Sequence, residues 1–144
     1  MGFLNGLLGN LSEQTPDSLR KEFGAYLSQN ESIQTGFKLI RDVMIITDRR
    51  ILFFDKQGAT GQKMRVASIY LHTIVDVTAE TAGFGLDDSE ITIIYMTNTF
   101  LASHNPSYAA RKFEFPKKYN ISALYLMLED LAFQNRMSIN GMQK

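Results

Sequence analysis

Residues 43–55 decide the fold and read Val43-Met44-Ile45-Ile46-Thr47-Asp48-Arg49-Arg50-Ile51-Leu52-Phe53-Phe54-Asp55. The first four residues are apolar, and four of the first five are β-branched, which favours a strand. Asp48 and Arg49 interrupt the apolar run and predict a turn, and residues 50–55 then form a second apolar and aromatic run. Two such runs joined by so short a polar segment predict an antiparallel pair of strands.

The pattern continues on both sides of this pair. Residues 33–39 alternate between larger side chains (Ile, Thr, Phe, Leu) and smaller or polar ones, which predicts a preceding strand. Four further strands are predicted at residues 63–70, 74–79, 90–95 and 111–115. The glycine-containing segments 57–62 and 81–85 predict turns between strands, and 98–107 predicts a loop. The sequence therefore predicts seven short strands.

Helices are expected before and after the strands. Residues 1–11 carry an apolar stripe at helical spacing, and Thr15 followed by Pro16 predicts the cap and first position of a second helix. Near the end of the chain, Asn120 is predicted to cap an amphipathic helix with apolar residues at helical spacing, namely Leu124, Met127, Leu128 and Leu131. After Phe133 the chain is polar, and we expect it to fray.

Strands followed by a terminal helix predict an α+β fold. We expect a small, partly open antiparallel barrel of seven strands, with the C-terminal helix covering one open end. The expected organisation is an N-terminal helical segment at residues 1–30, the barrel with its C-terminal helix at 31–134, and a polar tail at 135–144. The length of 144 residues suits one domain.

Composition excludes several classes of protein. There is no cysteine, so the chain has no disulfide framework, thiol nucleophile or cysteine-ligated metal. Fifteen basic residues balance fifteen acidic ones, which argues against a nucleic acid partner. No apolar run approaches the roughly 20 residues of a transmembrane helix, and no signal peptide pattern is visible. We therefore expect a cytoplasmic protein.

The sequence offers little support for catalysis. His72 and His104 fall in predicted loops far apart in the chain, and no three ligands have the spacing of a zinc site. Asp87, Asp88 and Glu90 are oxygen ligands of the kind calcium prefers, but a solvated acidic turn explains them better. No nucleophile elbow, P-loop or dinucleotide-binding motif is present. We predict a non-enzyme with no metal, no cofactor and no evident small-molecule substrate.

Charge is segregated along the chain. Residues 38–65 contain seven basic residues against three acidic ones, and residues 76–90 contain five acidic residues and no basic one. The basic set is Lys38, Arg41, Arg49, Arg50, Lys56, Lys63 and Arg65, and the acidic set is Asp76, Glu80, Asp87, Asp88 and Glu90. Ordinary surface charge is one interpretation, and contact with anionic lipid headgroups is another. A third is contact between unlike patches of two copies of the chain.

The N-terminal apolar stripe bears on the third interpretation. Phe3, Leu4, Leu7 and Leu8 serve either as intramolecular cover or as a contact between subunits. A helix lying on a membrane surface is disfavoured, because such helices usually carry Lys or Arg on the polar face and residues 1–11 have none.

Several motifs resemble the bacterial pleckstrin-homology domain family. They include the runs at residues 36–42, 47–58, 60–61, 68–70 and 80–83, together with Ile74 and the glycine-rich segment 1–10. The resemblance is strongest over residues 31–91. It implies a seven-stranded, partly open barrel capped by a C-terminal helix, ring-like homo-oligomers, and no catalytic machinery.

These observations predict a non-catalytic interaction or scaffold module that forms a homo-oligomer. The alternative is a peripheral module that binds anionic lipid headgroups through the basic residues between positions 38 and 65. Selective phosphoinositide binding is not expected, because the turn near residues 40–43 supplies only one Arg and one Asp to converge on phosphates.

Overall fold

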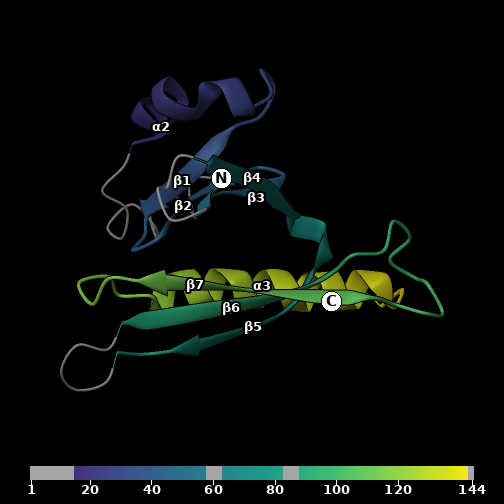
Figure 1. Ribbon diagram of the computed structural model, residues 1–144. Coiled ribbons are helices and arrows are strands. Elements are labelled where there is room, and N and C mark those ends of the chain that lie inside the picture. The colour runs from purple at the N-terminus through teal and green to yellow at the C-terminus, as the bar shows by residue number, and fades with distance from the viewer. Residues whose placement is uncertain (1–14, 58–62, 83–87, 143–144) are drawn as a thin grey trace. The chain divides into compact units, whose positions relative to one another are not determined.

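The computed structural model describes residues 15–57, 63–82 and 88–142, without the side chains of Lys56 and Gln57. These residues form two compact units, one within Met1–Ser68 and the other within Ile69–Lys144. Each unit has its own sheet (Figure 1). The predicted helix at residues 1–11 lies outside the described residues.

The first unit is a four-stranded sheet with a short helix on one face (Figure 1). Its strands run in the order β1-β2-β3-β4, and β1 pairs with β2, and β2 with β3, in antiparallel fashion. The elements are α2 (Pro16–Phe23), the 3-10 turn η1 (Gly24–Tyr26), β1 (Ile33–Lys38), β2 (Asp42–Thr47), β3 (Arg50–Gln57) and β4 (Lys63–Tyr70). The predicted hairpin at residues 43–55 is confirmed.

Both faces of β2 and β3 are buried, which explains their continuous apolar runs. Met44 pairs with Phe53 on one face, and Ile45 pairs with Leu52 on the other. The face with Ile45 and Leu52 packs against α2 in a core formed by Leu19, Phe23, Leu27, Ile45, Leu52 and Phe54. Because both faces are buried, these strands carry apolar side chains at successive positions and do not alternate between apolar and polar residues.

Helix α2 begins as predicted. The side chain of Thr15 accepts a hydrogen bond from the Ser18 amide at 3.1 Å, and Pro16 occupies the first turn. Leu19 and Phe23 are one turn apart and both face the core. Gly36 of β1 lies so close to Leu19 that a Cβ atom there would clash with Leu19 Cδ1 and lie 3.2 Å from Cδ2. The missing side chain lets the helix approach the strand.

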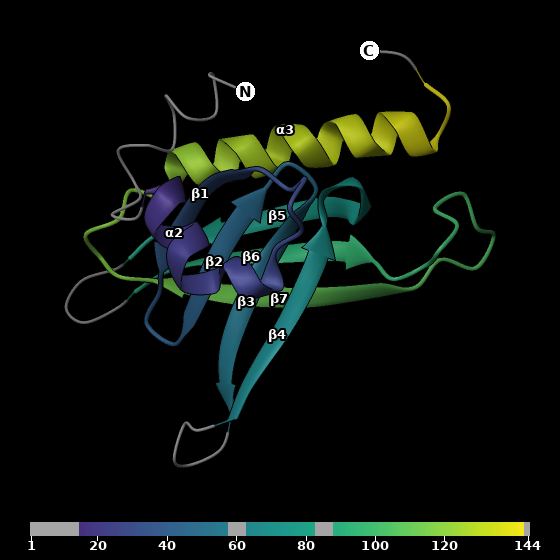
Figure 2. The same cartoon turned by 90° about the horizontal axis from the view of Figure 1, so that it is seen from above.

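The second unit is a three-stranded antiparallel sheet, in the order β5-β6-β7, with a long helix packed against β5 (Figures 1 and 2). Its elements are η2 (Leu71–Thr73), β5 (Ile74–Glu80), β6 (Ser89–Met96), β7 (Tyr108–Phe115) and α3 (Ser122–Ile139). Leu124, Leu128 and Ala132 repeat at four-residue spacing and are buried. Seven strands and a C-terminal helix confirm the predicted α+β class.

Several strand ends lie one or two residues from their predicted positions, and three further boundaries were wrong. Strand β7 begins at Tyr108 rather than Arg111, since Tyr108 pairs with Met96. The residue that caps α3 is Ile121, although the Asn120 side chain still accepts a hydrogen bond from the Ser122 amide at 3.1 Å.

The third error concerns the end of α3, which continues to Ile139 instead of fraying after Phe133. Asn135 Nδ2 donates hydrogen bonds to the carbonyl oxygens of Leu71 at 2.7 Å and Ile74 at 2.8 Å. These bonds attach the polar turn of the helix to the chain around β5. Tertiary contacts thus extend a helix that local sequence would end.

Candidate functional site

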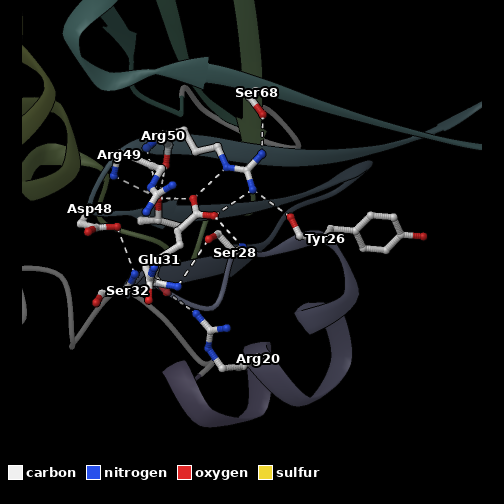
Figure 3. Close-up of polar contacts among 11 residues, drawn as sticks. Arg20, Tyr26, Ser28, Glu31, Ser32, Asp48, Arg49, Arg50 and Ser68 are labelled. Atoms are coloured by element: carbon white, nitrogen blue, oxygen red, sulfur yellow. Dashed lines mark hydrogen bonds and ion pairs between the residues drawn. The ribbon is translucent and has the colours of Figure 1, made fainter.

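The best-defined polar centre in the first unit joins Glu31 to Arg50 (Figure 3). Glu31 lies between η1 and β1, and Arg50 begins β3. Arg50 Nε lies 2.8 Å from Glu31 Oε2, and Arg50 Nη2 lies 2.9 Å from Oε1. This two-pronged geometry matches the planar guanidinium to the carboxylate and makes a strong charge-assisted pair.

Further donors surround the Glu31 carboxylate. The Thr47 hydroxyl donates to Oε2 at 2.7 Å, and the Ser28 amide donates to Oε1 at 3.2 Å. The side chain of Glu31 is fully buried, yet these hydrogen bonds, led by those from Arg50, lower its pKa to about 2. The carboxylate is therefore held in its charged form.

Arg50 also connects distant parts of this unit. Its Nη2 donates to the Tyr26 carbonyl at 2.8 Å and its Nη1 to Ser68 Oγ at 2.9 Å. Arg20 donates to the Glu31 carbonyl from α2. The guanidinium thus ties the connection after α2 to β3 and β4.

Arg50 corrects the predicted basic surface, because only 18% of its side chain is exposed. The partner Glu31 was not singled out in the sequence. It lies 19 residues away, and neither periodicity nor a motif links the two positions. An acid just before the predicted first strand is visible in the sequence, but its burial and its partner follow only from the folded sheet.

The other predicted basic residues do not form one patch. Lys38 and Arg41 lie at the β1–β2 turn, whereas Arg49 lies at the β2–β3 turn, the opposite end of β2. Lys63 and Arg65 are exposed on β4. Lys38 lies 3.6 Å from Glu22 of α2 in an exposed ion pair. Nothing is described of the Lys56 side chain.

A groove of about 350 Å³ opens beside the β1–β2 turn. Lys38 and Arg41 line it together with the buried Phe54 of β3. Ile40 and Met64, also in its lining, are 46% and 45% exposed, which is high for large apolar side chains. We call this hollow the β1–β2 groove. It combines two cations and two acids, Glu22 and Asp42, with exposed apolar surface.

The predicted acidic residues are spread over the β5–β6 hairpin. Glu80 and Asp88 are exposed near its turn, and Asp76 is half-buried nearer the start of β5. Glu90 lies 3.5 Å from Lys112 of β7, so an ion pair partly neutralises it. Asp87 lies outside the described residues, as do the predicted contact residues Phe3, Leu4, Leu7 and Leu8.

An apolar stripe lies on the exposed side of α3. Leu126 is 61% exposed and Phe133 is 43% exposed, and their seven-residue spacing places them on one face two turns apart. The exposed acids Glu129 and Asp130 lie between them along the helix. We call these four residues the α3 outer stripe. The sequence pattern does not reveal this stripe, because packing decides which apolar helix positions stay exposed.

No metal-binding cluster is found among the residues that the structure describes. His72 and His104 are both exposed. In this part of the chain, no three His, Asp or Glu side chains come together closely enough to hold a metal ion. None of the described helices is long and apolar enough to cross a membrane.

The two antiparallel sheets, of four and three strands, and the C-terminal helix define an α+β fold of the pleckstrin-homology (PH) type. The family model of the bacterial PH domain matches residues 2–132. The chain belongs to the bacterial PH domain family, which confirms the predicted resemblance.

Similar proteins agree with this assignment. The uncharacterized protein YjqA of Bacillus subtilis is 41% identical over 93 residues, which is 65% of this chain and 74% of that protein. A PH domain structure from Shewanella amazonensis is 30% identical with a TM-score of 0.61, covering 91% of this chain and 98% of that one.

A second structure comes from Shewanella loihica and is a DUF1696 family protein with a PH domain. It is 25% identical with a TM-score of 0.59, covering 84% of this chain and 96% of that one. These relatives establish the family and the fold, and none of their descriptions assigns a ligand.

Proposed function

We propose that this chain is a non-catalytic interaction module that self-associates through two unlike surfaces. The α3 outer stripe of one copy would contact the β1–β2 groove of another. The observation that carries the proposal is the exposed apolar pair Leu126 and Phe133, which matches the exposed Ile40 and Met64 of the groove. Of the groove's two cations, Lys38 already pairs with Glu22, so the acids that flank Leu126 and Phe133 complement Arg41. PH domains are generally non-catalytic interaction modules, which supports the same class of function.

Both surfaces have the character of an interface core with a polar rim. Burying one large apolar side chain contributes about 1.5–3 kcal/mol, so Leu126 and Phe133 supply most of the expected affinity. The charges add specificity and speed of association more than affinity. Because the two surfaces differ, repeated contacts generate a closed ring or an open chain of subunits.

Light scattering after size-exclusion chromatography tests this proposal. We expect the wild type to exceed the mass of one 16.3 kDa chain, and Leu126→Glu to shift the protein toward that mass. Ser138→Glu is the matched control, since it adds the same charge at an exposed position of α3 away from the stripe. A wild type that elutes at 16.3 kDa at micromolar concentration would refute self-association.

A charge swap identifies the partner surface. Arg41→Glu and Asp130→Arg should each weaken association, because each places like charges across the proposed contact. The double variant that carries both substitutions should regain the association that each single variant loses. If the two substitutions instead weaken association additively, the α3 outer stripe and the β1–β2 groove do not contact each other.

A second candidate function is contact with an anionic membrane surface through the β1–β2 groove. The exposed Ile40 and Met64 beside Lys38 and Arg41 favour it, since apolar tips flanked by cations suit the interface of a bilayer. Sedimentation with phosphatidylserine vesicles distinguishes the two functions. Membrane binding predicts salt-sensitive sedimentation that Leu126→Glu leaves unchanged, whereas self-association alone predicts no sedimentation.

A further inference from the structure

A pocket in the second unit lies between the end of α3, the sheet and the loop that joins β6 to β7. Its volume is about 600 Å³, within the range of roughly 300–1,000 Å³ that is usual for sites of small ligands. Ile94 and Met96 of β6, together with Leu101 of the loop, supply apolar lining. The sequence pattern does not reveal this pocket, because segments far apart in the chain build it.

Two opposite charges line the same pocket, Asp76 of β5 and Arg136 of α3. Arg136 Nε donates a hydrogen bond to the Val75 carbonyl at 2.5 Å. Asn135, next in the helix, holds the same turn through its bonds to Leu71 and Ile74. The guanidinium is therefore attached to the pocket wall through one nitrogen, which leaves its two terminal nitrogens for another acceptor.

The two charges do not satisfy each other. The Asp76 carboxylate accepts a hydrogen bond from the Val77 amide at 2.9 Å, on its own strand. Among the described residues, no ion pair within 4.0 Å joins Asp76 to Arg136. A ligand that carries both an anion and a cation would bridge this gap and pair with each residue.

We propose that this pocket binds a small zwitterion with an apolar side chain, either an apolar α-amino acid or a short apolar peptide. The ligand carboxylate pairs with Arg136, whose planar fork suits that group, and the ligand ammonium pairs with Asp76. The apolar side chain lies against Ile94, Met96 and Leu101. This inference is independent of self-association, because it uses neither Leu126 nor the β1–β2 groove.

Nuclear magnetic resonance titration of the full chain with L-leucine and with L-leucyl-L-leucine tests the proposal. Saturable chemical-shift changes at residues around the pocket are expected with at least one of these two ligands. The one that binds more tightly shows whether the pocket prefers an amino acid or a peptide. The matched analogues are 3-methylbutylamine, which lacks the carboxylate, 4-methylpentanoate, which lacks the ammonium, and glycine, which lacks the apolar side chain. Each should bind about tenfold more weakly or worse.

Two variants assign the charges. Asp76→Asn keeps an oxygen acceptor for the Val77 amide and should weaken binding of the zwitterion about tenfold, while leaving 4-methylpentanoate unaffected. Arg136→Gln should weaken both, and urea unfolding of each variant checks that it is folded. Arg65→Gln, an exposed cation on β4, is the control and should bind as the wild type does.

The proposal is overturned by absence of saturable shifts in the wild type at millimolar L-leucine and L-leucyl-L-leucine. It is also overturned if the analogues bind equally well, or if Asp76→Asn binds the zwitterion as the wild type does. Shifts confined to residues of the first unit would equally exclude this pocket as the site.

Discussion

Acidification is expected to weaken the fold through Glu31. The folded protein lowers the pKa of this carboxyl from 4.5 to about 2, mainly through the hydrogen bonds from Arg50. A group with a depressed folded pKa stabilises the protein above its unfolded pKa. Its contribution is therefore present in full at neutral pH and is lost as the pH falls from about 4.5 toward 2.

The size of the effect follows from the pKa difference. One pKa unit corresponds to 1.36 kcal/mol, so a shift from 4.5 to about 2 contributes about 3 kcal/mol to the free energy of unfolding. The Glu31 side chain is fully buried, so solvent does not screen the pair appreciably. That is a large share of the roughly 5–15 kcal/mol that stabilises a typical domain.

Urea unfolding of the wild type and of Glu31→Gln between about pH 7 and pH 2 measures this contribution. The variant has no carboxyl to titrate, so the gap in free energy of unfolding should shrink by about 3 kcal/mol as the pH falls. A gap that stays constant over this range would refute the role given to Glu31. Glu22→Gln is the control, since its exposed pair with Lys38 should contribute less than about 1 kcal/mol.

Three substitutions test the packing that positions these surfaces, each by urea unfolding. Gly36→Ala should cost about 1–3 kcal/mol, because its Cβ would clash with Leu19 Cδ1 and lie 3.2 Å from the Met44 carbonyl oxygen; unchanged stability would mean that α2 does not approach β1 so closely. Thr15→Ala should cost about 1 kcal/mol through loss of the helix cap, and Thr15→Ser should restore most of it. Leu128→Ala should cost about 2–5 kcal/mol, since the side chain is fully buried, and a cost under about 1 kcal/mol would contradict its place in the core.

The elements with strong local signals could be predicted from the sequence. The hairpin at residues 43–55 and the strand β4 at Lys63–Tyr70 follow from apolar runs bounded by polar turns, which are local features. Thr15 and Pro16 likewise specify the start of α2 through hydrogen bonding and backbone geometry within one turn. Local chemistry was sufficient in these cases.

Features that depend on distant contacts could not be predicted in this way. Arg50 has the sequence appearance of a surface cation, but Glu31 turns it into a buried partner. The polar end of α3 has the composition of a frayed tail, but Asn135 bonds to two carbonyl groups more than 60 residues away. The pocket around Arg136 depends on that same extension of the helix.

The bonds of Arg50 have a consequence for local motion in the first unit. They join the Tyr26 carbonyl, Glu31 and Ser68, so the connection after α2 cannot move away from the sheet unless several charge-assisted bonds break together. Amide hydrogen exchange in α2 should therefore be governed by opening of this whole segment rather than by fraying. In Arg50→Gln, the amide of Leu19 should exchange markedly faster.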